Sequence, residues 1–295
     1  MEEIKKTTAE TTNDTVTLPG ASTLGPSIRA ASVLTAFIAF TLPMMLVQSA
    51  LLKFSPPHAR KLPGWYHRRV CRLLGIRLHI DGEIASGRPV LIVSNHISWL
   101  DIPILSTIAP VSFVAKSEVG TWPVVSWLAR LQRSIFINRE RKADVGRVSN
   151  TMAERLAEGD LLVLFAEGTS TDGNRVLPFR SALLSPAFQK DTSDKKQDTT
   201  DGKHAAEPVV QTLSLAYTHL HGVPLGREGR KVVAWYGDMD MLSHAWKLLK
   251  AGPLDARISM SEPIALKDYQ NRKELAQSAE QQVRTNVVRM LRGEP

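Results

Sequence analysis

The pattern of apolar and polar positions divides this 295-residue chain into three parts. Residues 1–29 are rich in Thr, Glu, Lys, Ser, Pro and Gly and show no periodicity, which predicts a disordered tail. A run without any charged residue follows from Ala30 to Leu52, and it is long enough to cross a bilayer core as a helix. A helix buried in a protein core is the alternative for this run. From Ile76 onward, strand-length and helix-period segments alternate and predict one large domain.

The alternation after Ile76 is typical of an α/β fold. A polar, amphipathic helix is expected at Lys273–Leu291, and another at Asp144–Glu158, where Val145, Val148, Met152 and Leu156 share one face. Apolar runs of strand length are Ile76–Ile80, Val90–Val93, Val111–Ala115, Ser134–Ile137, Leu161–Phe165, Val209–Tyr217, Lys231–Trp235 and Ala256–Met260. We therefore expect a mostly parallel or mixed sheet covered by helices over residues 76–295, interrupted by a solvated loop at 189–207.

The net charge of +8 invites a partner that carries negative charge. Seven basic residues closely follow the apolar run: Lys53, Arg60, Lys61, Arg68, Arg69, Arg72 and Arg77. Only three basic residues, Lys5, Lys6 and Arg29, precede the run. This difference in basic charge between its two ends predicts that the domain faces the cytoplasm. It also predicts that residues 30–75 form a membrane-embedded helix with an interfacial basic segment. An anionic membrane surface then accounts for the charge, and nucleic acid is not expected as a partner. The single cysteine, Cys71, excludes disulfides within the chain and cysteine zinc sites.

The stretch Val90–Ile104, which reads VLIVSNHISWLDIPI, is the first candidate for chemistry. Its apolar strand ends in polar residues that include His96, at the place where α/β enzymes usually carry their functional groups. Asp101 follows five positions later and can fold back onto the imidazole if it opens the next helix. A carboxylate on one ring nitrogen fixes the tautomer and makes the histidine a general base. A loop histidine beside a helix N-cap is the alternative interpretation.

Two further stretches place polar residues at strand ends. The segment SIFINR delivers Arg139, whose planar charged fork suits phosphate or carboxylate, although a surface arginine beside Glu140 gives the same pattern. The segment LLVLFAEGTS runs a buried strand into Glu167, Gly168 and Thr169. Gly168 allows a positive φ or close backbone approach, and the turn can hold a polar ligand. Glu167 is expected to meet a cation or a hydroxyl, and an ordinary polar turn is the alternative.

Together the three stretches resemble the glycerolipid acyltransferases typified by 1-acylglycerol-3-phosphate O-acyltransferase. NHISWLD matches the NHxSxxD motif of that family, SIFINR its second motif and FAEGTS its FPEGTR motif. Lys116, Glu118 and Pro123 stand where the family often has a Lys-x-Glu and a proline. The resemblance covers roughly Val90 to Phe179.

The resemblance implies direct acyl transfer from a thioester to a lysolipid hydroxyl. His96 would remove the hydroxyl proton, Asp101 would orient His96, and no acyl-enzyme would form. Acyl carrier protein, or coenzyme A, would carry the acyl group, and neither a cofactor nor a metal is expected. Substrate binding would fall to Arg139, Glu167, Gly168, Thr169, Asn95 and Ser98.

The chain departs from the family pattern at two positions of its third motif. Ala166 replaces the proline and Ser170 replaces the arginine of FPEGTR. The segment VVQTLSLAY also lacks the proline of the fourth motif. Loss of an arginine weakens the case for a phosphomonoester acceptor. The chain is most similar to the lyso-ornithine lipid O-acyltransferase branch, with a bacterial-type inner membrane as its location. A 1-acyl-sn-glycerol-3-phosphate acyltransferase is the alternative.

Two other classes compete with an acyltransferase. A membrane-anchored serine hydrolase would use Ser98, which lies between His96 and Asp101, but residues so close in sequence rarely converge as a triad, and the chain lacks a nucleophile-elbow motif. A membrane-tethered binding protein would dock lipid or nucleic acid, but no phosphate-binding glycine motif is present. His219 and His221 form an H-x-H pair without an evident third metal ligand.

Overall fold

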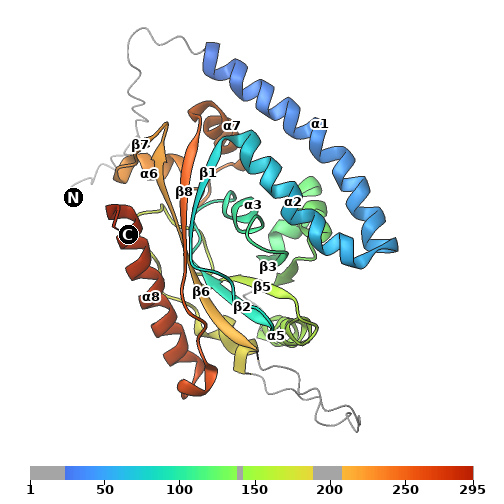
Figure 1. Ribbon diagram of the computed structural model, residues 1–295, viewed down its shortest axis with the longest axis vertical. Coiled ribbons are helices and arrows are strands. Elements are labelled where there is room, and N and C mark those ends of the chain that lie inside the picture. Colours follow the sequence, from blue (N-terminus) through green and yellow to red (C-terminus); the bar gives the residue numbers. More distant parts are fainter. Residues whose placement is uncertain (1–23, 138–141, 189–207, 295) are drawn as a thin grey trace, which may run out of the picture.

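One mixed sheet organises the computed structural model, which describes residues 24–137, 142–188 and 208–294 (Figure 1). The strands lie in the order β1-β8-β6-β2-β5-β3-β4, and β7 pairs with β6 off this path. All neighbours on the path are parallel except β6 and β8, which run antiparallel. The strands are β1 (Ile76–Asp81), β2 (Val90–Ser94), β3 (Val111–Lys116), β4 (Ile135–Ile137), β5 (Leu161–Phe165), β6 (Val209–Leu220), β7 (Val223–Pro224) and β8 (Leu254–Met260).

Helices cover both faces of this sheet. The α-helices are α1 (Leu24–Phe54), α2 (Pro56–Leu74), α3 (Asp101–Leu105), α4 (Pro123–Leu131), α5 (Lys142–Ala157), α6 (Arg227–Val233), α7 (Met241–Ala251) and α8 (Arg272–Arg292), and the 3-10 helices are η1 (Ser117–Thr121), η2 (Ser181–Phe188) and η4 (Leu266–Asp268). Figure 1 shows α1, α2 and α3 on one side of the sheet and α8 on the other. The expected α/β class with a mixed sheet is confirmed.

Strand β2 lies inside the sheet between β5 and β6, which explains its uninterrupted apolar sequence. Val90 and Ile92 pack into the core beneath α2, α3 and α7, whereas Leu91 and Val93 pack into the core beneath α5, η2 and α8. A strand buried on both faces has no place for the polar residues of an alternating pattern. Its carboxyl end therefore delivers the polar stretch from Ser94 onward to a fixed edge of a rigid sheet.

The N-terminal helices α1 and α2 are joined at Ser55, and Pro56 starts the second helix, where a missing N–H costs nothing. α1 packs against α2, α4 and α7. Near its start, Arg29 donates hydrogen bonds to the carbonyls of Leu249 and Leu74. Near its end, Gln48 donates to the carbonyls of Ala59 and Leu131. α1 is long and apolar enough to cross a membrane, and only 17 % of its most apolar window is buried.

Most expected elements are present with shifted ends. Seven of the eight expected strands are found with ends within three residues, and helices occur at both sites predicted within residues 76–295, as α5 and α8. Val148, Met152 and Leu156 of α5 are buried as the helical spacing predicts, while the side chain of Val145 lies outside the described part. The loop expected at 189–207 also lies outside it.

Two predictions are wrong. The segment Lys231–Trp235 is no strand, because its first three residues end helix α6. A short apolar run does not distinguish a strand from one buried turn of helix. Val233 ends α6, and Val233 and Ala234 are both buried in the core that also contains Leu248 of α7. The tail predicted at 1–29 is also too long. α1 begins at Leu24, since Pro26 is tolerated in a first helical turn and Arg29, one turn later, ties the start of the helix to Leu249. Residues 1–23 lie outside the described part.

Candidate active site

The loop after β2 is held in place by Asn95. Its side-chain amide donates to the carbonyl of Leu215 and accepts from the N–H of the same residue, both at 2.9 Å. Asn95 is buried, and Leu215 belongs to the neighbouring strand β6. Asn95 was expected to contact substrate, but both of its side-chain groups bond backbone here. The paired bonds fix the point at which the chain leaves the sheet, and so they fix the position of His96.

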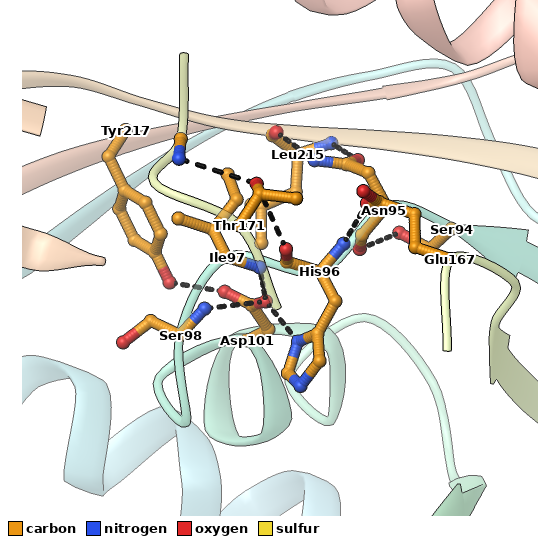
Figure 2. A network of polar contacts seen from close by, with 11 residues as sticks. Ser94, Asn95, His96, Ile97, Ser98, Asp101, Glu167, Thr171, Leu215 and Tyr217 are labelled. Atoms are coloured by element: carbon orange, nitrogen blue, oxygen red, sulfur yellow. Dashed lines mark hydrogen bonds and ion pairs between the residues drawn. The ribbon is translucent and has the colours of Figure 1, made fainter. Parts of the chain in front are cut away.

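The loop brings His96 onto Asp101, the first residue of α3. Nδ1 of His96 lies 2.7 Å from Oδ2 of Asp101, and Oδ2 also accepts from the backbone N–H groups of Ile97 and Ser98 (Figure 2). An ionised carboxylate only accepts, so Nδ1 carries the proton and Nε2 keeps a free lone pair. The imidazole stacks on Phe165, the last residue of β5, with ring centroids 4.0 Å apart. Its side chain keeps 19 % of its surface exposed.

The opposite oxygen of Asp101 has a different partner. The phenol of Tyr217, on strand β6, donates to Oδ1 at 2.7 Å. Asp101 and Tyr217 are both buried completely or nearly so, at 0 % and 1 % exposure. Burial of a carboxylate is costly unless its lone pairs are satisfied, and here four donors converge on two oxygens. The arrangement satisfies both oxygens of the aspartate in a dry position next to His96.

Glu167 supports His96 from the backbone side. Its Oε1 accepts from the N–H of His96 and its Oε2 from the N–H of Leu177, each at 2.8 Å. The prediction that Glu167 contacts a cation or a hydroxyl is wrong, because two backbone N–H groups donate to its two oxygens. Burial raises the pKa of Glu167 to about 7, and the two backbone N–H groups oppose that rise. Glu167 therefore ties the loop after β2 to the segment that leads into η2.

The turn after Glu167 closes over the same loop. The backbone N–H of Thr171 donates to the carbonyl of His96 at 2.9 Å. Gly168 adopts a φ of +77°, and a Cβ there would lie 2.7 Å from Nε of Arg180, so both expected uses of this glycine are confirmed. Thr169 is exposed at the tip of the turn and Ser170 is partly exposed. The turn thus holds the backbone of His96 through Thr171 and exposes the hydroxyl-bearing residues Thr169 and Ser170.

Known proteins with the same pattern identify the family. The Acyltransferase family model matches residues 75–194. A lyso-ornithine lipid O-acyltransferase of Brucella abortus is 39 % identical over 90 % of this chain and 97 % of its own length. A lyso-ornithine lipid O-acyltransferase of Rhizobium meliloti is 40 % identical over 86 % and 84 % of the two chains. The chain belongs to the acyltransferase family.

More distant relatives include a 1-acyl-sn-glycerol-3-phosphate acyltransferase of Neisseria meningitidis, 26 % identical over 72 % of this chain and 78 % of that one. Among solved structures, the 1-acyl-sn-glycerophosphate acyltransferase PlsC of Thermotoga maritima superposes with a TM-score of 0.62 over 91 % of this chain and 95 % of that chain, at 22 % identity. That likeness shows that the two proteins share a fold. This protein is therefore an acyltransferase enzyme with the fold of that structure.

Ser98 of this acyltransferase is fully buried, and its hydroxyl has no hydrogen-bond partner in the described part of the chain. The backbone of Ser98 contributes to holding Asp101, while its side chain is closed off from a substrate at the surface. The same burial deprives the serine-hydrolase alternative of an accessible nucleophile. Among the sequence-predicted site residues, Arg139 lies outside the described residues, as does Asn138 beside it.

Other residues singled out in the sequence take places around this edge. Lys116 ends β3 and pairs with Glu118 at 3.0 Å, and Pro123 starts α4. His219 contacts the hydroxyl of Thr218, and His221 contacts the carbonyl of Ala251. Both histidines of the H-x-H pair therefore bond to protein groups. Tyr217 was not among the expected site residues. The departure of VVQTLSLAY from the fourth family motif pointed at its strand, but nothing local indicated that its phenol reaches Asp101.

Proposed function

We propose that this acyltransferase moves a fatty acyl group from a thioester to the hydroxyl of a lysolipid, with His96 as general base. The observation that carries the proposal is the contact between Nδ1 of His96 and Oδ2 of Asp101, which leaves Nε2 without a hydrogen-bond partner among the described residues at a partly exposed position. A histidine in this tautomer takes a proton at Nε2, and the adjacent carboxylate stabilises the imidazolium that forms.

The reaction balances without a covalent enzyme intermediate. The acceptor hydroxyl gives its proton to Nε2 of His96 while its oxygen attacks the thioester carbonyl carbon. The C–O bond forms, the C–S bond breaks, and the departing thiolate takes the proton back from Nε2. Asp101 stays ionised throughout. Stacking of the imidazole on Phe165 keeps its plane fixed during both proton transfers.

Lyso-ornithine lipid is the proposed acceptor. The relatives that are 39 % and 40 % identical carry that acceptor in their names. Ser170 also stands where the FPEGTR motif has an arginine, which suits an acceptor without a phosphomonoester. The exposed side chain of Arg180 crosses the turn at Gly168, two residues from Ser170, and its guanidinium makes no hydrogen bond or ion pair with any described residue. A free guanidinium at this place suits the carboxylate of an ornithine headgroup.

The remaining site roles are proposals as well. Thr169 at the exposed tip and Arg139 beyond β4 are proposed to contact the acceptor headgroup. Glu167 and Asn95 are proposed to act through the loop that carries His96, because their polar atoms bond backbone. The proposed acyl donor is acyl carrier protein, or coenzyme A, since both are acidic and the chain carries a net charge of +8.

We propose that α1 and α2 together attach the protein to the membrane and that residues 76–295, which follow them in the sequence, form the catalytic domain. Arg29 and Gln48 tie both ends of α1 to the body, which favours a helix lying along the body over a helix that leaves it to cross the bilayer alone. Its exposed apolar side chains include Leu34, Ile38, Leu42 and Leu46. Basic side chains of α2 would meet anionic headgroups of a bacterial inner membrane on its cytoplasmic side.

An acceptor panel tests the proposal. The membrane-reconstituted enzyme receives one acyl-carrier-protein donor with lyso-ornithine lipid or lysophosphatidate, and product formation is followed by mass spectrometry. We expect lyso-ornithine lipid to be preferred, and Ser170→Arg to move the preference toward lysophosphatidate by about tenfold, the value of one charge-assisted contact. Gln277→Arg, which adds the same charge on the exposed side of α8, is the control. A tenfold or larger wild-type preference for lysophosphatidate would favour the phosphatidate-forming alternative.

A further inference from the structure

The phenol of Tyr217 enters the site from a distant part of the sequence. It lies 116 residues after Asp101 along the chain and donates to Oδ1 of that residue at 2.7 Å. Figure 2 shows the phenol and the imidazole of His96 approaching the carboxylate from different sides. Tyr217 sits in β6 opposite Ala256 of β8, and its ring is part of the buried core. The position of the hydroxyl is therefore set by the sheet itself.

The two oxygens of Asp101 are held unequally. Oδ2 accepts from His96 Nδ1 and from the backbone N–H groups of Ile97 and Ser98. Oδ1 accepts from Tyr217, the only donor to that oxygen within residues 24–137, 142–188 and 208–294. Without the phenol, one oxygen of a fully buried carboxylate would have no donor. The carboxylate would then be less stable as an anion and freer to rotate away from the imidazole.

We propose that Tyr217 is a positioning residue, which holds Asp101 ionised and aimed at His96 during acyl transfer. The inference rests on the proposed roles of His96 and Asp101. The competing explanation is that Tyr217 only packs the core, and that its hydroxyl takes the nearest acceptor. The two explanations differ in whether removal of one oxygen atom changes proton transfer at His96.

The phenol is suited to act as a permanent donor. Burial and the neighbouring Asp101 raise the pKa of Tyr217 well above its ordinary value, so the hydroxyl stays neutral across the working pH range. The other ionisable groups that face this pair are His96, the thiol of Cys71 on α2 and the carboxylate of Glu167 after β5. Burial raises the pKa of the Cys71 thiol to about 12, so this thiol is neutral as well.

The test is Tyr217→Phe, which keeps the buried ring and removes only the donor. We expect kcat to fall about tenfold to a hundredfold, the value of a hydrogen bond to a charged group, with the acceptor KM within about twofold. Loss of the donor also favours protonation of the His96–Asp101 pair. The acid limb of the pH–rate profile should therefore move to higher pH, an effect that a loss of packing alone would not produce.

Two further variants make the outcome decisive. Tyr269→Phe removes a phenol that bonds Ser278 at 2.9 Å on the other face of the sheet, and it should leave kcat and the acid limb unchanged. In an Asp101→Asn background, Tyr217→Phe should cost much less than in the wild type, because the phenol acts through the carboxylate.

An unchanged kcat and acid limb for Tyr217→Phe would overturn the inference, and so would an equal loss in both backgrounds. If His96→Ala abolishes turnover while Tyr217→Phe leaves it intact, the proposed function stands and this inference fails. If His96→Ala remains active, the proposed mechanism itself fails.

Discussion

The carboxylate of Glu167 accepts a hydrogen bond from the backbone N–H of His96 at 2.8 Å, although the two residues are 71 positions apart. Its second oxygen accepts from Leu177 at the same distance. One buried side chain thereby joins the loop after β2 to the segment after β5. Glu167 fixes where the imidazole stands, and it does so without offering an oxygen to a substrate.

Glu167→Gln is predicted to weaken both stability and turnover. The amide nitrogen of glutamine cannot accept, so one of the two backbone donors loses its partner in a buried place. The expected cost is about 1–3 kcal/mol of unfolding free energy near pH 5, together with a fall in kcat as His96 loses its fixed position. Denaturant unfolding in detergent and steady-state rates measure both effects. Glu154→Gln, on the exposed side of α5, is the control and should behave as wild type.

The stability of the wild-type protein is predicted to fall as pH rises from about 4.5 to about 7. The folded protein holds a proton on Glu167 up to a pKa of about 7, whereas the unfolded chain releases it near 4.5. In that window the folded state binds more protons, so the contribution of Glu167 to stability is full below the window and is lost through it. The largest loss is about 3 kcal/mol. Between pH 4.5 and 8 the unfolding free energy of wild type should fall, whereas that of Glu167→Gln, which has no proton to release at this position, should fall less. The stability difference between the two proteins should therefore be largest in the acid range and shrink toward pH 8; parallel curves would contradict the assignment.

The sequence predicted the parts of this site that depend on neighbouring residues. The spacing of His96 and Asp101 predicted their contact because one turn and one helix start separate them. The apolar run of β2 predicted a buried strand because every one of its positions faces a core. The hydrogen bonds of Glu167 and of the Tyr217 phenol could not be predicted in this way, because the order of the strands decides which distant segments lie side by side. Lys231–Trp235 failed for a related reason: burial alone does not reveal whether a short apolar run is helical.

Arg180→Ala is predicted to raise the KM for lyso-ornithine lipid by about tenfold or more while kcat changes little. The guanidinium crosses the turn at Gly168 and, on this account, binds the headgroup carboxylate with a charge-assisted bond. A lyso-ornithine lipid whose carboxylate is converted to a carboxamide should bind wild type and variant alike. Arg175→Ala, an exposed arginine of the same segment, is the matched control. If the variant still discriminates carboxylate from carboxamide as wild type does, Arg180 has no role in recognition.

Membrane association is predicted to survive a high-salt wash. Salt screens the basic side chains of α2, but it does not weaken the burial of exposed apolar side chains of α1 in the bilayer. The double variant Leu42→Asp, Leu46→Asp should shift the protein toward the soluble fraction, because these side chains are 55 % and 66 % exposed. Val288→Asp, on α8 across the sheet, should not. Deletion of residues 1–23 should leave location unchanged, and release of the intact chain by salt alone would rule out apolar insertion.

The central claim is that His96 removes the proton from a lysolipid hydroxyl. Its most direct test compares single-turnover rates of wild type and His96→Ala with lyso-ornithine lipid and an acyl-carrier-protein thioester, in reconstituted membranes and with folding checked by thermal unfolding. General-base catalysis contributes about 10²- to 10⁴-fold, so the variant should lose at least 99 % of the rate, and Asp101→Asn somewhat less. A folded His96→Ala protein that keeps more than about a tenth of the wild-type rate would contradict the account.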